Sequence, residues 1–403
     1  MVERVVVTGM GSISALGSNV QQFWSQLSSG RPAIRELTGF PSGSLKTTVG
    51  AQVRGFNSAD HFSSDLIPLL DRHSQLALMA AWEAVRDAGL NAELLRSSAA
   101  VVGTACGGKE TDEQTYHRLY QAGKKGAHPL TIPRGMPSAA ASQVSMQLGI
   151  EGPVFSISSA CASANHAIAQ AALLIRSGLV SVAVAGGTDA PFTYGLLKAW
   201  EALRVLAGDT CRPFCVDRKG LVLGEGSGIV VLESLRHASL RGARIYAELA
   251  GFGMSADAQH ITDPSAEGAV RAIRAALDDA GCKATSVSYV NAHGTGTRAN
   301  DLVETRALHQ VFGDHACRLA VSSTKSMHGH ALGAAGGLEF VATVLALIND
   351  LAPPTANFTR PGEGCDLDYV PNEARSMTID VALTNSFAFG GLNAVLLLRK
   401  MRS

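Results

Sequence analysis

Short apolar runs alternate with longer stretches of helical periodicity along the whole chain. This alternation is typical of an α/β protein. The runs that predict strands are 5–8, 99–103, 182–185, 228–232, 288–291, 320–322 and 394–398. The stretches that predict helices are 74–88, 162–176, 266–280 and 331–348. The last stretch is rich in Ala, Leu and Val with few charges, so we expect it to be buried on several sides.

The order of the predicted elements repeats along the chain. The weakest seam lies near 241–244, where LRGAR precedes a new strand in IYAELAGFGM. Both halves then run strand, helix, strand, with glycines after the strands. A duplicated pair of α/β halves explains this order, and we divide the chain into residues 1–242 and 243–403.

Composition limits the classes of partner. The 403 residues are 46% hydrophobic and 17% charged, and 34 Lys+Arg balance 34 Asp+Glu. No basic tract predicts a nucleic acid or an anionic membrane as partner. No stretch approaches the ~18 apolar residues of a membrane span, and the apolar run at the N-terminus is too short for a signal peptide.

Cysteine usage favours a reducing compartment. The seven cysteines are odd in number and form no zinc-type pair of CxxC units. In a large chain without a secretion signal, free thiols in the cytoplasm are the simpler interpretation. We therefore predict a cytoplasmic protein.

Two glycines follow the first predicted strand in the sequence Gly9-Met10-Gly11. The next glycine, Gly17, comes too late for a GxGxxG motif, and no acidic residue lies ~20 positions on, where a ribose would need one. A tight strand-to-helix turn is favoured over a dinucleotide site.

The motif SSACAS contains Cys161 between a short predicted strand, 153–157, and an Ala-rich helix. The thiol therefore lies at or near a helix N-terminus, where the macrodipole of roughly +0.5 charge favours thiolate. An inert, buried Cys packed like Ala is the alternative, and this motif alone does not decide between them.

A second motif, NAHGTGT, places His293 at the end of a predicted strand, where α/β proteins keep their sites. Asp301 and Glu304 follow on the next helix. The alternative is a histidine that merely caps a loop.

A third motif, SSTKSMHGH, contains Lys325, His328 and His330 at a turn that opens a small-residue helix. Glu339 follows nine residues after His330, about two and a half helical turns on. A HxH pair can suggest a metal, but no third ligand is evident, so we predict none. His328 is the less certain of the two histidines and is interpreted as a possible surface residue.

A fourth motif, NSFAFGGLN, lies at a strand end near the C-terminus. Its paired glycines free the backbone to turn and offer N–H groups. A glycine-rich hairpin with its phenylalanines in the core is the alternative.

Together SSACAS, NAHGTGT, SSTKSMHGHALGAAG and NSFAFGG, in this order and spacing, resemble the elongating β-ketoacyl-acyl-carrier-protein synthases. The resemblance runs from VVVTGMG to NAVLLL and includes CRPFCVDRKGLVLGEGSG. It implies the thiolase fold, with two similar α/β halves packed as five layers, α-β-α-β-α, and usually a dimer. It also implies decarboxylative Claisen condensation of carrier-bound acyl groups, two carbons at a time, with no cofactor.

The resemblance implies roles for the motif residues. Cys161 would take the acyl group, and N–H donors of His293 and His330 would stabilise the enolate formed as carbon dioxide leaves the malonyl group. Backbone N–H groups of Cys161 and Phe389 would hold the oxyanion, and Phe389 would also gate the thiol. Lys325 and Glu339 would support the site. The positions expected to contact substrate are Thr295, Thr297, Phe387 and Cys106.

Several positions depart from the family pattern. Ala388 and Leu392 replace the usual Gly and Thr of the gating segment, Cys215 stands where an acidic residue is usual, and Leu221 replaces a Phe. Cys106 matches a position at the far end of the acyl pocket, near the dimer partner. Its small side chain predicts room for a longer chain, or for one that is not saturated and straight.

The expected partner is an acyl-carrier protein, loaded with acyl or malonyl groups. The stretch 64–70 lacks the basic run that suits an acidic carrier, while Lys124, Lys125 and Arg212 remain. We predict a dedicated carrier or a different docking mode, and either a homodimer or a heterodimer with a related chain-length subunit.

Three other functions compete with this interpretation. A thiolase would need a second Cys in the C-terminal Gly-rich motif, but the last cysteine is Cys365. A silent chain-length subunit would lack the nucleophile, whereas Cys161 is present. A cysteine hydrolase would leave the second histidine and Lys325 unexplained. The condensing enzyme is therefore favoured.

Overall fold

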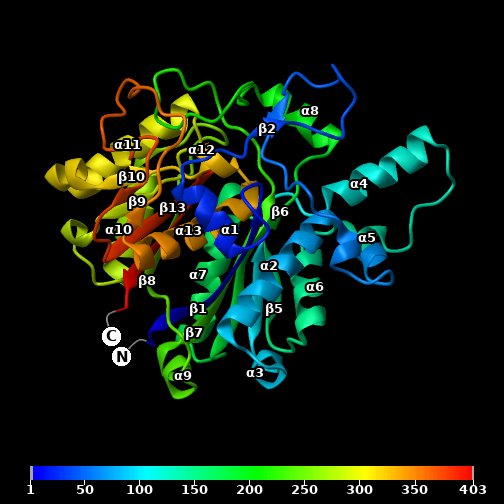
Figure 1. The fold of residues 1–403 in the computed structure, drawn as a ribbon, viewed down its shortest axis with the longest axis horizontal. Coiled ribbons are helices and arrows are strands. Elements are labelled where there is room, and N and C mark those ends of the chain that lie inside the picture. The colour runs from blue at the N-terminus through cyan, green and yellow to red at the C-terminus, as the bar shows by residue number, and fades with distance from the viewer. Residues whose placement is uncertain (1–2, 402–403) are drawn as a thin grey trace.

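The computed structural model describes residues 3–401, and a ten-stranded mixed sheet runs through them (Figure 1). The strand order is β10-β9-β13-β14-β8-β1-β7-β6-β4-β5. Those strands are β1 Val5–Ser14, β4 Ala99–Gly103, β5 Val154–Ile157, β6 Val182–Asp189, β7 Gly226–Ser234, β8 Ala247–Ala256, β9 Tyr289–Asn291, β10 Ala320–Ser322, β13 Val381–Ala388 and β14 Leu392–Lys400. Two small sheets pair β2 Arg35–Glu36 with β3 Val49–Gly50 and β11 Leu351–Ala352 with β12 Arg375–Ser376.

Helices cover both faces of the sheet. They are α1 Val20–Ser28, α2 Arg72–Ala88, α3 Ala92–Arg96, α4 Lys109–Tyr116, α5 Thr131–Gly135, α6 Ala139–Leu148, α7 Ser163–Arg176, α8 Tyr194–Leu203, α9 Leu235–Leu240, α10 Ala266–Asp279, α11 Arg298–Phe312, α12 Lys325–His328 and α13 Ala335–Asn349. Single 3₁₀ turns, η4 Ala160–Ala162 and η7 Leu332–Ala334, lead directly into α7 and α13.

The two halves of the sheet repeat one topology. Strands β5-β4-β6-β7-β1 and β10-β9-β13-β14-β8 follow the same order, with parallel pairs at the outer edge and antiparallel pairs toward the middle. The halves join where residues 5–7 of β1 pair with residues 247–249 of β8. Both of these strands carry a bulge at the same relative position, Thr8 and Ala250.

Five layers result from this repeat. Helices α7 and α13 lie between the half-sheets and contact strands of both, while α2 and α6 cover one outer face and α10 the other, with α11 packed on α10. The five-layered α-β-α-β-α architecture predicted from the sequence is confirmed. The repeat extends to the turns before the central helices, since Ala160 and Leu332 have φ of +49° and +50° at the start of η4 and η7.

The stretch before and within α13 forms the centre of the core. Among the described residues, Leu332–Asn349 is the one helical stretch with the length and apolar composition of a membrane span, which differs from the sequence expectation that no stretch approaches that length. Within the protein, 89% of it is buried, as expected for a helix packed between two sheets.

Gly9 and Gly11 lie inside β1 and not in a turn, so the predicted strand-to-helix turn is wrong. A Cβ at Gly11 would stand 1.9 Å from the Ala80 carbonyl oxygen, and one at Gly9 would stand 2.2 Å from that of Ala84. Both glycines therefore let α2 pack directly on the strand. The sequence pattern could not separate a turning glycine from a packing one.

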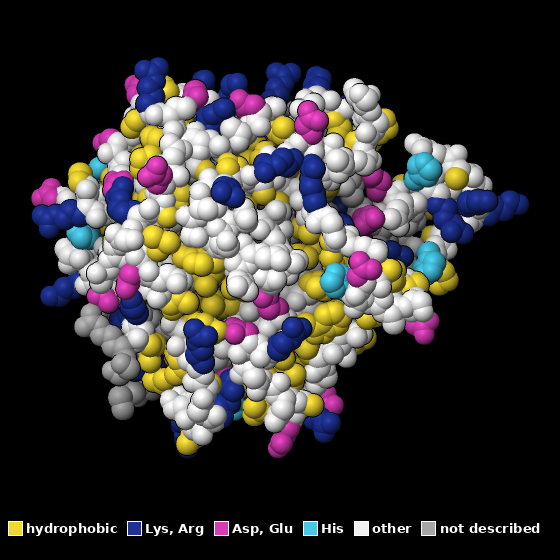
Figure 2. Space-filling view, in the orientation of Figure 1, with side chains coloured by type: hydrophobic (Ala, Val, Ile, Leu, Met, Phe, Trp, Pro, Cys, Tyr) yellow, Lys and Arg dark blue, Asp and Glu magenta, His cyan; other side chains and the backbone are white. Residues whose placement is uncertain are grey.

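One segment leaves the layered body. Helix α4 and the chain that follows it to α5 project to the right in Figure 1, while the start of β1 and the end of β14 lie near each other at the lower left. Figure 2 shows Lys and Arg side chains at the tip of this projection and along the upper rim of the same face. Lys124 and Lys125 are exposed in this segment.

Candidate active site

Cys161 lies in the sharp turn between β5 and α7. Ala160 adopts the left-handed φ of +49°, and the Ser163 hydroxyl accepts from the Ser159 N–H (2.9 Å) and donates to the Ala160 carbonyl (2.7 Å). Gly103 on β4 lets the start of α7 approach, because a Cβ there would stand 2.4 Å from the Ser163 carbonyl carbon. The turn thus holds the Cys161 thiol, 7% exposed, at the start of the central helix.

His330 faces the thiol from the other half. Its Nε2 lies 3.0 Å from Cys161 Sγ, and its backbone is bonded to the 222–224 segment by its N–H and its carbonyl, at 2.7 and 2.9 Å. Nδ1 accepts from the Leu332 N–H at 3.3 Å. Since Nδ1 is an acceptor, the hydrogen of the neutral ring is assigned to Nε2, which points a donor at the sulfur.

His293 follows β9, as its motif predicts. Glu304 on α11 fixes the turn by accepting from the N–H groups of His293 and Gly294, each at 2.8 Å, and from Asn385 Nδ2 at 3.1 Å. The His293 and His330 rings meet edge to face, with centroids 5.4 Å apart. The sequence places Glu304 on the helix after His293 but does not predict its role, because only the fold shows which N–H groups it binds.

A buried ion pair lies behind the two imidazoles. Lys325 Nζ bonds Glu339 Oε1, and both side chains are fully buried. Burial, reinforced by the Lys325 charge, lowers the pKa values of His293 and His330 well below the usual range for histidine. Both rings are therefore neutral near pH 7, and each offers one N–H donor.

His328 is buried, so its interpretation as a surface residue is wrong. Its Nε2 bonds the Thr324 hydroxyl at 2.9 Å, and its ring packs 6.2 Å from the ring of Phe23 on α1. Burial lowers its pKa to about 3. The His328 ring contacts Thr324 and Phe23 instead of His330, so the HxH spacing does not form a metal site.

The charge state of Cys161 is set by opposing effects. Burial raises the pKa of the thiol to about 12, while the positive charge of Lys325 and the backbone N–H of Phe389 act in the lowering direction. The N-terminus of α7 also favours the thiolate. Because the Phe389 N–H faces the sulfur, it lies where a donor to an oxyanion would be needed.

Two cavities meet at the thiol. The first spans about 640 Å³, open solvent included, and Thr295 and Thr297, whose hydroxyls lie 2.9 Å apart, are among its lining residues. Of the predicted residues, it is lined by Cys161, His293, His330, Thr295, Thr297, Phe387 and Phe389. The second also reaches the thiol and is lined mostly by apolar side chains, with Cys106 and Ser158 among its lining residues.

The segment between β13 and β14 carries Phe389 to the boundary of both cavities. Gly390 and Gly391 follow it with φ of +81° and +69°, and the Gly390 N–H donates to the Ile261 carbonyl at 2.7 Å. Phe387, on β13, packs edge-on against His293 with ring centroids 6.2 Å apart. The predicted glycine turn is confirmed. It closes the hairpin of β13 and β14, as the alternative had it, but both phenylalanines line the first cavity.

Asp189, which the sequence analysis did not single out, fixes the wall near Cys106. Its carboxylate is buried and accepts from the Cys106 and Gly333 N–H groups at 3.1 and 2.6 Å, as well as from Thr104 Oγ1 and the Ala105 N–H, each at 2.8 Å. It thereby joins the end of β4 to the turn after His330. The sequence feature that could have indicated Asp189 is an acidic residue at the end of the apolar strand β6.

One atom each of Cys161, His293 and His330 lies within 4.8 Å of the other two, a spacing that could hold a metal ion. This set differs from the HxH pair considered in the sequence. The fit is poor, because His330 Nε2 carries the ring hydrogen while Nδ1 is occupied by the Leu332 N–H. We therefore derive no step through a metal.

Family models match both halves of the chain. The model of the β-ketoacyl synthase N-terminal domain matches residues 2–238, and that of the C-terminal domain matches residues 246–359. The chain belongs to the β-ketoacyl synthase family, whose members are acyl-transferring condensing enzymes.

Two similar proteins have different names. The chain is 50% identical over 404 residues to Nodulation protein E of Rhizobium meliloti (strain 1021), with 100% of both chains covered. It is 43% identical to 3-oxoacyl-[acyl-carrier-protein] synthase 2 of Coxiella burnetii (strain RSA 493 / Nine Mile phase I), with 99% of both covered.

Solved ketosynthases share the whole fold. The ishigamide ketosynthase/chain length factor matches with a TM-score of 0.95 and 36% identity over all of both chains. A type II PKS ketosynthase, bound to the hexaketide and in complex with its acyl-carrier protein, matches with a TM-score of 0.92 and 34% identity, again over all of both chains. The thiolase fold expected from the motifs is thereby confirmed.

Proposed function

We propose that Cys161, His293 and His330 are the reacting groups of a β-ketoacyl-[acyl-carrier-protein] synthase. The observation that carries this proposal is the approach of His330 Nε2 to Cys161 Sγ at 3.0 Å, with the His293 ring edge-on to the same imidazole. Two neutral donors from one half of the chain and one thiol from the other line a single cavity.

The first half-reaction is acyl transfer. The Cys161 sulfur attacks the carbonyl of an acyl-carrier thioester, the carbon–sulfur bond to the carrier breaks, and the thiol proton leaves with the carrier's thiolate. The backbone N–H groups of Cys161 and Phe389 hold the oxyanion between these events. The acyl chain then occupies the cavity beside Cys106.

The second half-reaction is condensation. A malonyl-carrier thioester enters past Thr295 and Thr297, and its carbonyl oxygen accepts from His293 and His330. Loss of carbon dioxide leaves an electron pair that these donors stabilise as an enolate. The carbon attacks the acyl-Cys161 carbonyl, a carbon–carbon bond forms, and the thiolate of Cys161 leaves. Burial and the Lys325 charge keep both rings neutral, and Lys325 and Glu339 do not react.

We further propose a cytoplasmic enzyme composed of the halves 1–242 and 243–403. The seven cysteines, none of which forms a disulfide in the described residues, support the location. Lys124, Lys125 and Arg212 are the basic groups proposed for docking an acidic carrier. A homodimer is the first candidate assembly. The likeness to the ishigamide ketosynthase/chain length factor favours a heterodimer with a silent relative as the second.

The test combines purified protein with an acyl-carrier protein and a malonyl-carrier protein, followed by intact mass measurement of every species. An acyl adduct on the enzyme and a β-ketoacyl carrier two carbons longer are expected, and Cys161→Ala should show neither. An adduct without elongation would indicate that a partner subunit is missing. Neither species, across several chain lengths and carriers, would contradict the proposal.

A further inference from the structure

The boundary between the two cavities consists of three side chains. Among the described residues, only Cys161, Trp200 and Phe389 line both the entrance cavity with the histidines and the apolar cavity with Cys106. An acyl chain carried in through the entrance must therefore pass these side chains before its carbonyl rests on the thiol and its tail in the second cavity.

The rings of Trp200 and Phe389 close this passage. They are stacked, with centroids 6.1 Å apart and planes inclined by 26°. A carbon chain lying between two rings needs about 3.5–4.0 Å of contact distance on each side, so the rings must stand about 7–8 Å apart. The stacked pair leaves no room for the chain, and the rings must separate.

The two rings differ in their freedom to move. Trp200, on α8, is 9% exposed and packs among the side chains of Leu197, Leu221, Leu223 and Leu332. Phe389 instead precedes two glycines in the turn between β13 and β14. The indole is thus the fixed surface, and Phe389 is the side chain that leaves it.

We propose that Trp200 is the latch of the Phe389 gate, a positioning and specificity-determining residue for acyl transfer; this rests on the proposed function. In the closed state the stacked indole holds Phe389 so that its backbone N–H faces the Cys161 sulfur. In the open state the stack is broken and the acyl tail passes. Trp200 therefore favours the closed state, which suits condensation, over the open state, which loading requires.

Opposite effects on the two half-reactions follow. Aromatic stacking stabilises the closed state. Its loss in Trp200→Leu should therefore raise the rate of Cys161 acylation about 2- to 10-fold, most for long acyl groups. The same variant should slow condensation of the preloaded enzyme about 2- to 10-fold, because Phe389 is no longer held over the thiol. Trp200→Phe keeps a ring and should restore both rates most of the way.

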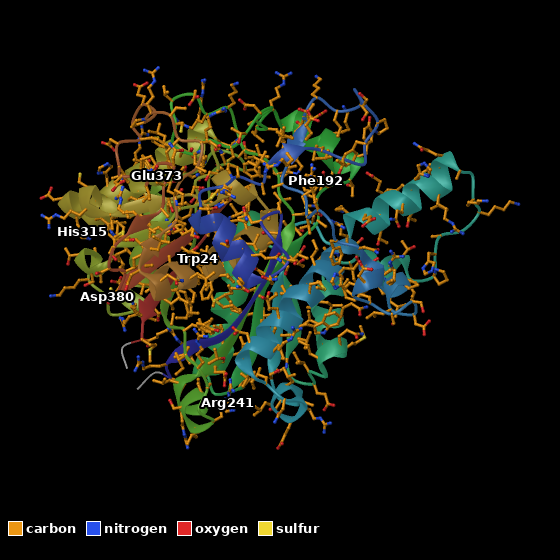
Figure 3. All side chains as sticks on the ribbon, in the orientation of Figure 1. Trp24, Phe192, Arg241, His315, Glu373 and Asp380 are labelled. Atoms are coloured by element: carbon orange, nitrogen blue, oxygen red, sulfur yellow. The ribbon has the colours of Figure 1, made fainter. Side chains whose placement is uncertain are left out.

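The experiment measures acylation of Cys161 by timed intact mass, with short and long acyl carriers. Condensation is then measured by mixing the preloaded enzyme with malonyl-carrier protein. Trp24→Leu is the matched control, since Trp24 lies on α1 away from α8 (Figure 3) and should change neither rate. Faster loading with slower condensation supports the latch. A parallel fall in both rates, or no change, overturns it.

A second readout does not depend on the leucine variant folding. With Trp24→Phe and Trp82→Phe, Trp200 is the remaining tryptophan. Its emission should change on acyl loading, and by less in a Phe389→Ala background, where the tail reaches the indole but no stacked ring leaves it. Emission unchanged by loading that mass measurement shows to be complete would overturn the latch, whereas absence of any wild-type adduct would contradict the proposed function itself.

Discussion

At the scale of single residues, the arrangement of donors around His330 decides what chemistry the imidazole can do. The Leu332 N–H occupies Nδ1, so the ring hydrogen lies on Nε2 and faces Cys161. A neutral ring fixed in this way is a donor to developing negative charge and not a base for the thiol proton. This distinguishes the site from a cysteine hydrolase, which needs an accepting nitrogen beside the sulfur.

Burial is the main cause of the low pKa values of His293 and His330, and the Lys325 charge is the second cause. Replacing the buried pair together, by Lys325→Met with Glu339→Gln, removes that charge without leaving a lone carboxylate. The pKa values of His293 and His330 should rise toward 6.5. Because the reaction depends on neutral rings, the variant should lose activity on acidification at a higher pH than the wild-type protein does. The pH profile of kcat/KM for condensation measures this, and an unmoved acid limb would contradict it.

Glu304 acts on His293 through the backbone, by accepting two N–H groups of its turn. Glu304→Ala leaves both groups buried without partners, at about 1–3 kcal/mol each. We expect a lower melting temperature together with a fall in kcat, as His293 loses its position. Glu304→Gln keeps one accepting oxygen and should lie between, as seen by calorimetry. Equal melting temperatures for all three proteins would exclude this role.

The sequence predicts those site residues that lie in short local motifs. Cys161, His293 and His330 each lie in a short motif next to a strand or helix, and the structure brings them together. Asp189 and Trp200 were not singled out, since their importance comes from partners on other elements: the Cys106 and Gly333 N–H groups for one and the Phe389 ring for the other.

At the scale of elements, the same glycine pattern sets helix against strand in both halves. Gly11 in β1 lies under α2, and Gly253 in β8 lies under α10, where added Cβ atoms would stand 1.9 and 2.0 Å from helix carbonyl oxygens. This correspondence supports the repeat more directly than sequence identity does.

Gly11→Ala and Gly253→Ala should each destabilise the protein, because the helix must move away from the strand. Overpacking of this kind costs about 1–3 kcal/mol. Gly126→Ala is a suitable control, since nothing lies within 4 Å of its added Cβ and its φ is not positive. Urea unfolding should show the two core variants shifted and the control unchanged. A neutral Gly11→Ala would refute the packing argument.

Predicted elements agree best where apolar composition alone defines them. Strands β4 and β10 have the predicted bounds, whereas β1 runs from Val5 to Ser14 and continues well past the predicted 5–8. The part beyond residue 8 contains Gly9 and Gly11, and strand propensity disfavours glycine, but the close packing of α2 requires it there. Local pattern therefore found the strand and missed its length.

At the scale of the whole molecule, the two halves are not independent. The central helices α7 and α13 contact strands of both half-sheets, so either half alone would expose the apolar surface of a central helix. The thiol comes from one half and both imidazoles from the other.

Expressed separately, 1–242 and 243–403 should each be insoluble and inactive. Co-expressed, they should associate and recover acylation and condensation, because no helix or strand crosses the division between α9 and β8. Co-purification followed by the mass assay tests this. An active 1–242 fragment that loads acyl groups by itself would contradict it.

The matching φ of Ala160 and Leu332 shows that the turn carrying Cys161 exists twice, with Gly333 at the position equivalent to Cys161. The turn in the second half supports the wall near Cys106. Its Gly333 N–H binds Asp189, and a side chain at Gly333 would stand 2.4 Å from the Ala105 nitrogen and 2.6 Å from Asp189 Oδ2. A side chain at Gly333 would therefore displace the wall that carries Cys106. The turn in the second half thus leaves room only for a glycine and serves to support the first half's turn, so the two halves can no longer exchange roles.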